Sequence, residues 1–89
     1  MSECNAPAIE ARLRERFSPS ALVVADESAA HAGHAGAGDT GEGTHFRVTI
    51  TSAAFQGTNR VQRHRLVYDA LDDFFALGLH ALAVHAQAD

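Results

Sequence analysis

Hydrophobic positions recur along this chain with two different periods, and each period predicts a kind of element. Residues 6–17 repeat every three or four residues, as one face of a helix does, with apolar positions at Ala6, Ile9, Leu13 and Phe17. The following Ser-Pro-Ser at 18–20 predicts the end of this helix. Residues 21–26 are apolar and β-branched, and residues 44–51 alternate strictly, so each range predicts a strand, and the two are expected to pair antiparallel.

The second half of the chain predicts a short turn, one long helix and a last strand. Residues 52–57 are predicted to form a short turn of helix or a loop, and the long helix runs from about Thr58 to Ala76, with Gly78 as its stop. Residues 79–86 predict the third strand, in which His80 shares a face with Leu82 and Val84. The apolar stripe of the helix consists of Val67, Ala70, Leu71, Phe74 and Phe75.

The order of these elements, α-β-β-α-α-β, predicts the topology. The helical crossover between the second and third strands is long enough to make those two strands parallel. We therefore expect an α+β fold with a three-stranded mixed sheet and helices packed on one face. Residues 1–89 are expected to form a single domain, with a flexible N-terminus over about residues 1–5. Residues 27–43 contain five of the seven glycines and almost no bulky apolar residue, which predicts a mobile loop.

Charge and composition narrow the functional classes. Eleven acidic residues against seven arginines and no lysine give a formal net charge of -4, which argues weakly against nucleic-acid binding. The chain has neither a long apolar run nor the features of a signal peptide, so a cytoplasmic location without a membrane contact is expected. The single cysteine, Cys4, is unable to form an internal disulfide, and a zinc site built from this chain alone is not expected.

One stretch of the chain combines several fixed spacings. An aromatic-x-Gly element is followed after five residues by Arg-His-Arg, then by Val-Tyr and a leucine, and finally by an apolar-His-Ala-Leu element. These elements are Phe55-Gln56-Gly57, Arg63-His64-Arg65, Val67-Tyr68, Leu71 and Leu79-His80-Ala81-Leu82, with Asp26-Glu27-Ser28, His31 and Thr44-His45-Phe46 upstream. With this pattern the chain resembles the BolA family from about Ala6 to His85. The resemblance implies a class II KH-like fold, which agrees with the predicted order of elements.

The six histidines are the main candidates for chemistry, because no nucleophile, acid/base pair or phosphate loop stands out. The resemblance implies that His80 is a ligand to a [2Fe-2S] cluster shared with a monothiol glutaredoxin, where nitrogen in place of a thiolate raises the reduction potential. The alternative is a histidine hydrogen-bonded at a strand end. His31 corresponds to the second ligand of the histidine-loop subgroup, and His34 is the other candidate for that place. The alternative for both is a solvated flexible loop.

The histidines at positions 45, 64 and 85 are expected to have other places. His64 lies one turn before Val67 and Tyr68 and is predicted to be half buried and structural. His45 and His85 are predicted to be exposed and receive no role. The basic helix surface formed by Arg60, Arg63, His64, Arg65 and Tyr68 admits three interpretations. It is a docking face for the glutaredoxin and its glutathione, a DNA-phosphate patch, or an ordinary charged helix surface.

Two functions follow from the resemblance. The first is a non-enzymatic adaptor that forms a heterodimer with a monothiol glutaredoxin, for iron-sulfur trafficking or for iron and redox regulation. The cluster is expected only in that complex, with glutathione supplied through the partner, and the free chain is expected to be a monomer or weak homodimer. The second is a DNA-binding transcriptional regulator of morphology and stress response that uses the helix from Arg60 to Tyr68. No catalytic constellation has the required spacing, so an enzyme is not expected.

Overall fold

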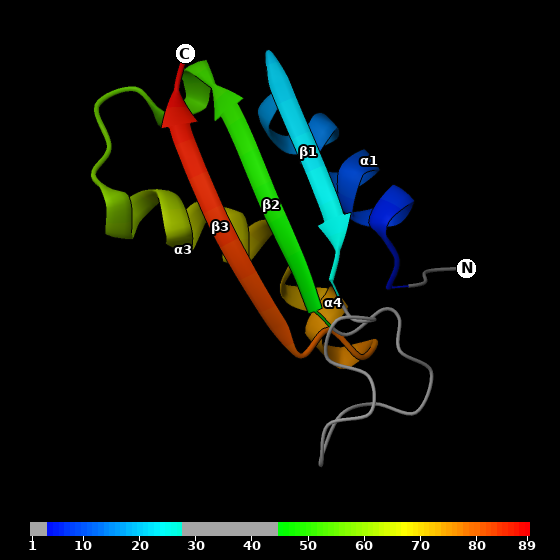
Figure 1. The fold of residues 1–89 in the computed structure, drawn as a ribbon. Helices are drawn as coiled ribbons and strands as arrows, with labels where there is room; N and C mark the ends of the chain where they lie inside the picture. The colour runs from blue at the N-terminus through cyan, green and yellow to red at the C-terminus, as the bar shows by residue number, and fades with distance from the viewer. Residues whose placement is uncertain (1–3, 28–44) are drawn as a thin grey trace.

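A computed structural model describes residues 4–27 and 45–89 (Figure 1). It contains seven elements in the order helix, two strands, a short 3-10 helix, two helices and a strand. These elements are α1 (Ala6–Phe17), β1 (Ala21–Asp26), β2 (His45–Ser52), η1 (Ala53–Phe55), α3 (Arg60–Ala70), α4 (Asp72–Ala76) and β3 (Ala81–Ala88). The observed order confirms the predicted α+β fold. The loop predicted over residues 27–43 lies, apart from Glu27, outside the described residues.

The first helix has clear start and stop signals. The Asn5 side chain accepts a 2.9 Å hydrogen bond from the amide of Ala8, and Pro7 stands in the first turn, where its missing N–H removes no helical hydrogen bond. Ser18 ends the helix in a left-handed conformation with φ of 44°. The helix therefore spans the predicted range, and its apolar face packs Ile9 and Leu13 into the core.

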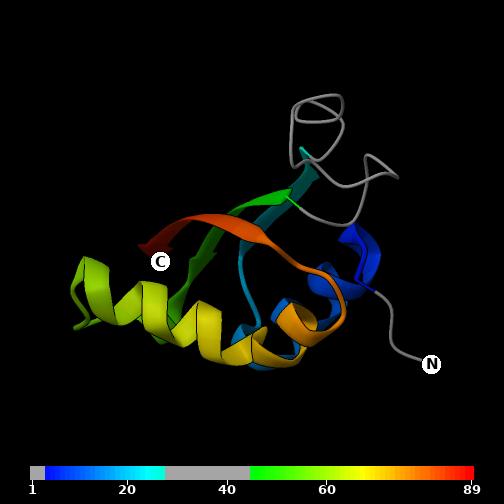
Figure 2. The same cartoon turned by 90° about the horizontal axis from the view of Figure 1, so that it is seen from below.

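The three strands form one mixed sheet in the order β1-β2-β3. β1 and β2 are antiparallel, with Ala21 opposite Thr51, and β2 and β3 are parallel, with His45 opposite Ala81. Figure 2 shows all the α-helices on one side of the sheet, as the sequence predicts. The other face of the sheet carries no helix and exposes small and polar side chains together with Val23, which is 62% exposed.

The hydrophobic core lies between the sheet and the helices. Every second residue of β2 is buried, so that strand contributes one complete face to the core. The buried apolar residues are Ile9, Leu13, Phe46, Val48, Ile50, Phe55, Val67, Ala70, Leu71, Phe74, Leu79, Leu82 and Val84. The only buried polar side chain among the described residues, Ser52, donates to the carbonyl of Phe17 at 2.6 Å and accepts from the amide of Ala54. This hydroxyl joins the ends of α1, β2 and η1.

The predicted single helix from Thr58 to Ala76 is wrong, because the chain turns at Leu71. α3 begins at Arg60 after a capping box between Asn59 and Gln62, and it ends at Ala70. Leu71 is fully buried at the turn, and α4 begins with two aspartates that favour a helix N-terminus. The carbonyl of Ala70 accepts a 2.8 Å hydrogen bond from Arg12 of α1, which replaces the helical partner lost at the break.

The third strand begins two residues later than predicted, at Ala81 rather than at residue 79. Gly78 turns the chain with φ of 116°, and Leu79 is buried before the strand starts. The prediction that His80 shares a face with Leu82 and Val84 is therefore wrong: His80 precedes the strand and is exposed, whereas those two residues are buried. No helix among residues 4–27 and 45–89 is long and apolar enough to cross a bilayer.

Candidate functional site

His80 lies immediately before β3, and the three residues Gly78, Leu79 and His80 have different structural roles. Gly78 supplies the left-handed turn, Leu79 fills the core, and the next side chain is exposed. The buried neighbour fixes the backbone on one side, and the pairing of Ala81 with His45 of β2 fixes it on the other. His80 is therefore an accessible imidazole on a well-anchored segment of backbone, which suits a ligand supplied to a shared site.

His45 lies beside His80, a proximity that sequence reasoning missed. The two ring centroids are 5.5 Å apart, and the ring planes are tilted by 60°. His45 was predicted to be exposed, but it is half-buried, because the parallel register places the first residue of β2 opposite the first residue of β3. The start of these two strands thus carries a pair of histidines from positions 35 residues apart in the sequence.

The other predicted ligands remain untested. His31 and His34 lie outside the described residues. Within the described ranges, no three His, Cys, Asp or Glu side chains converge in a way that could hold a metal ion. Burial, and secondly the charge of Asp26, raise the pKa of the Cys4 thiol, which disfavours the thiolate that a metal would bind.

The basic helix surface divides into side chains that bond to β3 and side chains that do not. Tyr68 donates to the carbonyl of Leu82 at 2.8 Å, the Nε2 atom of His64 lies 3.2 Å from the carbonyl of Val84, and Arg63 donates to the carbonyl of Ala86 at 3.3 Å. A carbonyl only accepts, so the Nε2 atom of His64 carries the hydrogen. The prediction that His64 is half-buried is confirmed, and its ring bonds to the backbone of β3.

The spacing of these bonds follows from the geometry of the two elements. His64 and Tyr68 are four residues apart, which is about 6 Å along a helix, and alternate strand residues are about 6.6 Å apart. His64 and Tyr68 therefore meet alternate carbonyls on the outer edge of β3, and the longer side chain of Arg63 reaches the next one, at Ala86. We call these three contacts, from Arg63, His64 and Tyr68, the carbonyl ladder.

The exposed part of the basic surface is smaller than predicted. Arg60 and Arg65 are exposed, and Val61 between them is 59% exposed, while Arg63, His64 and Tyr68 are only partly exposed. Arg63 contacts Ala86, six residues beyond His80 and about 20 Å away along a strand. The predicted site residues of α3 are therefore spread along β3, with Tyr68 at the end near His80 and Arg63 toward the other end.

Comparison with known proteins decides the family. The chain matches the family model for BolA-like proteins over residues 13–89. The chain belongs to the BolA family. It is 49% identical over 83 residues to SufE-like protein 1 of Arabidopsis thaliana, which covers 89% of this chain and 22% of that protein. It is 46% identical over 83 residues to Protein BOLA1 of the same plant, with 92% of this chain and 52% of that protein covered.

The BolA relationship extends to animals and to solved structures. The chain is 44% identical over 80 residues to BolA-like protein 1 of Mus musculus, covering 90% of this chain and 55% of that protein. The chain thus spans between 22% and 55% of the length of these three curated relatives. BolA1 from Arabidopsis thaliana superposes with a TM-score of 0.83 at 43% identity, covering 99% of this chain and 95% of that chain. The BolA domain of SufE1 gives 0.81 at 43% identity, covering 93% and 90%.

The open face of the sheet holds a second cluster that sequence reasoning did not find. Arg47 donates to the carboxylate of Glu27 at 3.1 Å, and its Nη1 atom lies 3.4 Å from the Nε2 atom of His85. Because arginine only donates, the Nε2 atom of His85 accepts, and its Nδ1 atom carries the hydrogen. His85 is exposed, as predicted. The alternation of β2 places Arg47 on this face, but no sequence signal indicates its partners.

Proposed function

We propose that this BolA-family protein is a non-enzymatic adaptor that binds a monothiol glutaredoxin and co-ligates a [2Fe-2S] cluster in the heterodimer. The observation that carries the proposal is the exposed His80 imidazole, anchored between the buried Leu79 and the β2–β3 pairing. A neutral histidine nitrogen is an established ligand of such clusters, where it raises the reduction potential. The partner supplies its cysteine and a glutathione thiolate, so this chain needs to contribute nitrogen ligands only.

The second ligand from this chain has three candidates. His31 and His34 come from the sequence pattern, and His45 comes from its position 5.5 Å from His80 between ring centroids. If His45 is not the ligand itself, its ring still lies against His80 and restricts the orientation of that imidazole. In either case replacing His45 is expected to alter the environment of the cluster. Only if His45 is a ligand does its replacement also remove a coordinating atom.

The test is anaerobic coexpression with a monothiol glutaredoxin, followed by visible absorption and circular dichroism of the purified complex. The wild-type chain is expected to give a coloured heterodimer, and His80→Ala is expected to change or abolish its spectrum. His85→Ala is the matched control, because His85 is also an exposed histidine but lies in the middle of β3, five residues beyond His80. An unchanged spectrum in His80→Ala, or an equal change in His85→Ala, would remove His80 from the ligand set.

Single substitutions of the remaining histidines separate the candidates for the second ligand. His31→Ala, His34→Ala and His45→Ala are compared in the same coexpression. The ligand is the residue whose loss changes the spectrum as much as the loss of His80 does. If none of the three has that effect, the proposal of a second histidine ligand fails, while the role of His80 stands or falls on its own variant.

A second candidate function, DNA binding through α3, is supported by the two exposed arginines of that helix, Arg60 and Arg65. Arg63 is only partly exposed and spends two of its five N–H groups on Thr58 and Ala86, so it is less accessible to the backbone of a duplex than Arg60 and Arg65 are. Two phosphate contacts predict a slope of log affinity against log salt of about -1.8, whereas three would give about -2.7. A salt-titrated binding assay on duplex DNA measures this slope. Affinity that does not change with salt would exclude this mode of binding.

A further inference from the structure

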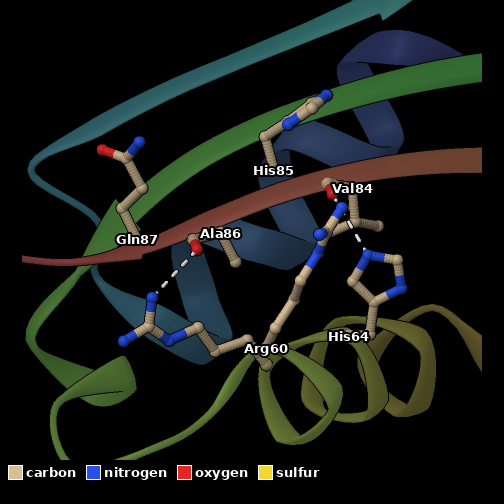
Figure 3. A pocket seen from close by; sticks show the side chains of 7 residues that line it. Arg60, His64, Val84, His85, Ala86 and Gln87 are labelled. Carbon is tan, nitrogen blue, oxygen red and sulfur yellow. Dashed lines mark hydrogen bonds between the residues drawn. The ribbon is translucent and has the colours of Figure 1, made fainter.

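A pocket of about 230 Å³ lies between the beginning of α3 and the outer edge of β3. Arg60, Arg63 and His64 line it from the helix, and residues 84–87 line it from the strand. Figure 3 shows Arg60 and His64 reaching from the helix toward the strand, whereas His85 and Gln87 project from the strand away from the helix. The pocket is smaller than the roughly 300 to 1,000 Å³ typical of sites for drug-sized ligands, so it suits a small group.

The charged side chains that line this pocket are all positive. The lining contains two arginines, two histidines and one glutamine, and none of its residues is acidic. The whole chain, in contrast, carries more acidic than basic residues and a formal net charge of -4. A concave site lined by cationic groups concentrates the field and attracts anions. The chemistry of the lining therefore selects an oxyanion.

Several donors in the pocket are available to a ligand. Arg63 donates through Nε to the hydroxyl of Thr58 at 3.0 Å and through Nη1 to the carbonyl of Ala86 at 3.3 Å, which leaves about three of its five N–H groups. Its guanidinium is fixed before a ligand arrives, which reduces the entropy lost on binding. Arg60 makes no hydrogen bond or ion pair within the described ranges, so its whole guanidinium is available.

Two further polar side chains, His85 and Gln87, line the pocket from β3 at its rim and project away from α3 (Figure 3). The Nε2 atom of His85 accepts from Arg47, so its Nδ1 atom carries a hydrogen. Gln87 adds a side-chain amide with two N–H groups. The two arginines alone offer about eight free N–H groups, more than the two oxygens of a carboxylate can use, and their two permanent positive charges match a dianion. A phosphate group has three terminal oxygens and carries close to two negative charges, and arginine recognises it bidentately.

We propose that this pocket binds a phosphate group, either inorganic phosphate or the phosphate of a small organic monoester. The site goes beyond the adaptor function, because its strand residues begin four residues, about 13 Å along β3, beyond His80 and it needs no partner. Binding would place a dianion beside α3 and β3 and would give hydrogen-bond acceptors to the free N–H groups of Arg60 and Arg63.

The test is a ¹H–¹⁵N NMR titration of the isolated full chain with sodium phosphate, glycerol phosphate and acetate, at an ionic strength held constant with sodium chloride. Saturable shifts are expected in residues 84–87 and in the first turn of α3, with weaker binding of acetate. The phosphate source that binds more tightly identifies the ligand as free phosphate or as an organic monoester. Arg60→Gln is expected to raise Kd about tenfold.

Arg16→Gln is the matched control, because it removes the same charge from an exposed position on α1, outside the pocket. It is expected to keep the Kd of the wild-type chain. The proposal is overturned if the shifts do not saturate, if acetate binds as tightly as phosphate, or if the two arginine variants weaken binding equally. Because the assay contains neither glutaredoxin nor iron, its outcome is independent of the adaptor proposal.

Discussion

The hydroxyl of Tyr68 on α3 donates a 2.8 Å hydrogen bond to the carbonyl of Leu82 on β3, two residues after His80. Tyr68→Phe removes this hydroxyl and keeps the ring, which packs against the core and stacks on Phe75 at 5.6 Å. The carbonyl then loses its donor, so we expect the free energy of unfolding to fall by about 1 kcal/mol. Urea denaturation followed by far-ultraviolet circular dichroism measures the change.

Thr49→Val provides a control for Tyr68→Phe. It also removes one hydroxyl, but from an exposed residue on the open face of the sheet. Its effect is expected to stay within about 0.5 kcal/mol, as for most surface substitutions. Equal losses in the two variants would show that the Tyr68 hydrogen bond contributes nothing specific to stability.

His64 and His80 are predicted to respond in opposite ways to removal. His64→Ala leaves the carbonyl of Val84 without its donor, so we expect a loss of about 1 to 2 kcal/mol in stability and no change in the spectrum of the glutaredoxin complex. His80→Ala removes an exposed side chain, so we expect little loss of stability and an altered spectrum. Denaturation and visible circular dichroism of both variants make the comparison. A spectrum that changes only in His64→Ala would contradict the assignment.

The ion pair between Arg12 and Asp73 predicts a pH-dependent part of stability. Arg12 donates to both carboxylate oxygens at 2.6 and 2.9 Å, and this hydrogen bonding holds the pKa of Asp73 below its ordinary value. The lowered pKa means that the pair stabilises the fold above about pH 4, and that its contribution is lost as the pH falls through the pKa of the folded state. The contribution is small, because Asp73 is exposed.

Urea midpoints of the wild type and Asp73→Asn between pH 7 and pH 2.5 test this prediction. The variant is expected to be slightly less stable at pH 7, and the difference is expected to shrink below about pH 4. The substitution leaves the bond from Arg12 to the carbonyl of Ala70 in place, so only the ion pair is removed. A difference that stays constant over the whole pH range would show that the charge of Asp73 is not involved.

We predict that replacing Gly78 destabilises the fold, because of the backbone conformation at this position. Its φ is 116°, and a Cβ atom added there would meet nothing within 4 Å, so the penalty of Gly78→Ala is conformational rather than steric. We expect a loss of about 1 to 3 kcal/mol in stability by thermal or urea denaturation. Gly57→Asn is the control: with φ of 74° and equally open surroundings, Gly57 lies closer to the left-handed region that asparagine tolerates. A smaller loss at Gly78 than at Gly57 would contradict this explanation.

The periodic elements could be predicted from the sequence because periodicity reports burial. The predicted ranges of the first helix and the first two strands agree with the structure to within one residue. The break at Leu71 could not be predicted, since Leu71 and Phe74 belong to the same apolar stripe whether or not a turn separates them. What completes the break is the bond from Arg12 to Ala70, which joins residues 58 positions apart.

The site was predicted only in part, for a similar reason. The family pattern indicates His80, but the neighbouring His45 depends on the parallel register of β2 and β3, which no local pattern specifies. The spacing of His64 and Tyr68 indicates one shared helix face, yet their partners are backbone carbonyls, which are present at every position. Side-chain motifs are visible in a sequence, whereas their backbone acceptors become visible only in the fold.

The carbonyl ladder also affects whether a further strand can pair with the edge of the sheet. β3 is an edge strand, and its outward-facing carbonyls would otherwise offer a template for backbone pairing with another chain. Three of them, at Leu82, Val84 and Ala86, already accept side-chain hydrogen bonds from α3. A strand added at this edge would first have to displace the ladder, at about 1 kcal/mol for each bond. This flank of the molecule is therefore protected from indiscriminate strand addition, and a partner that binds here must recognise its side chains.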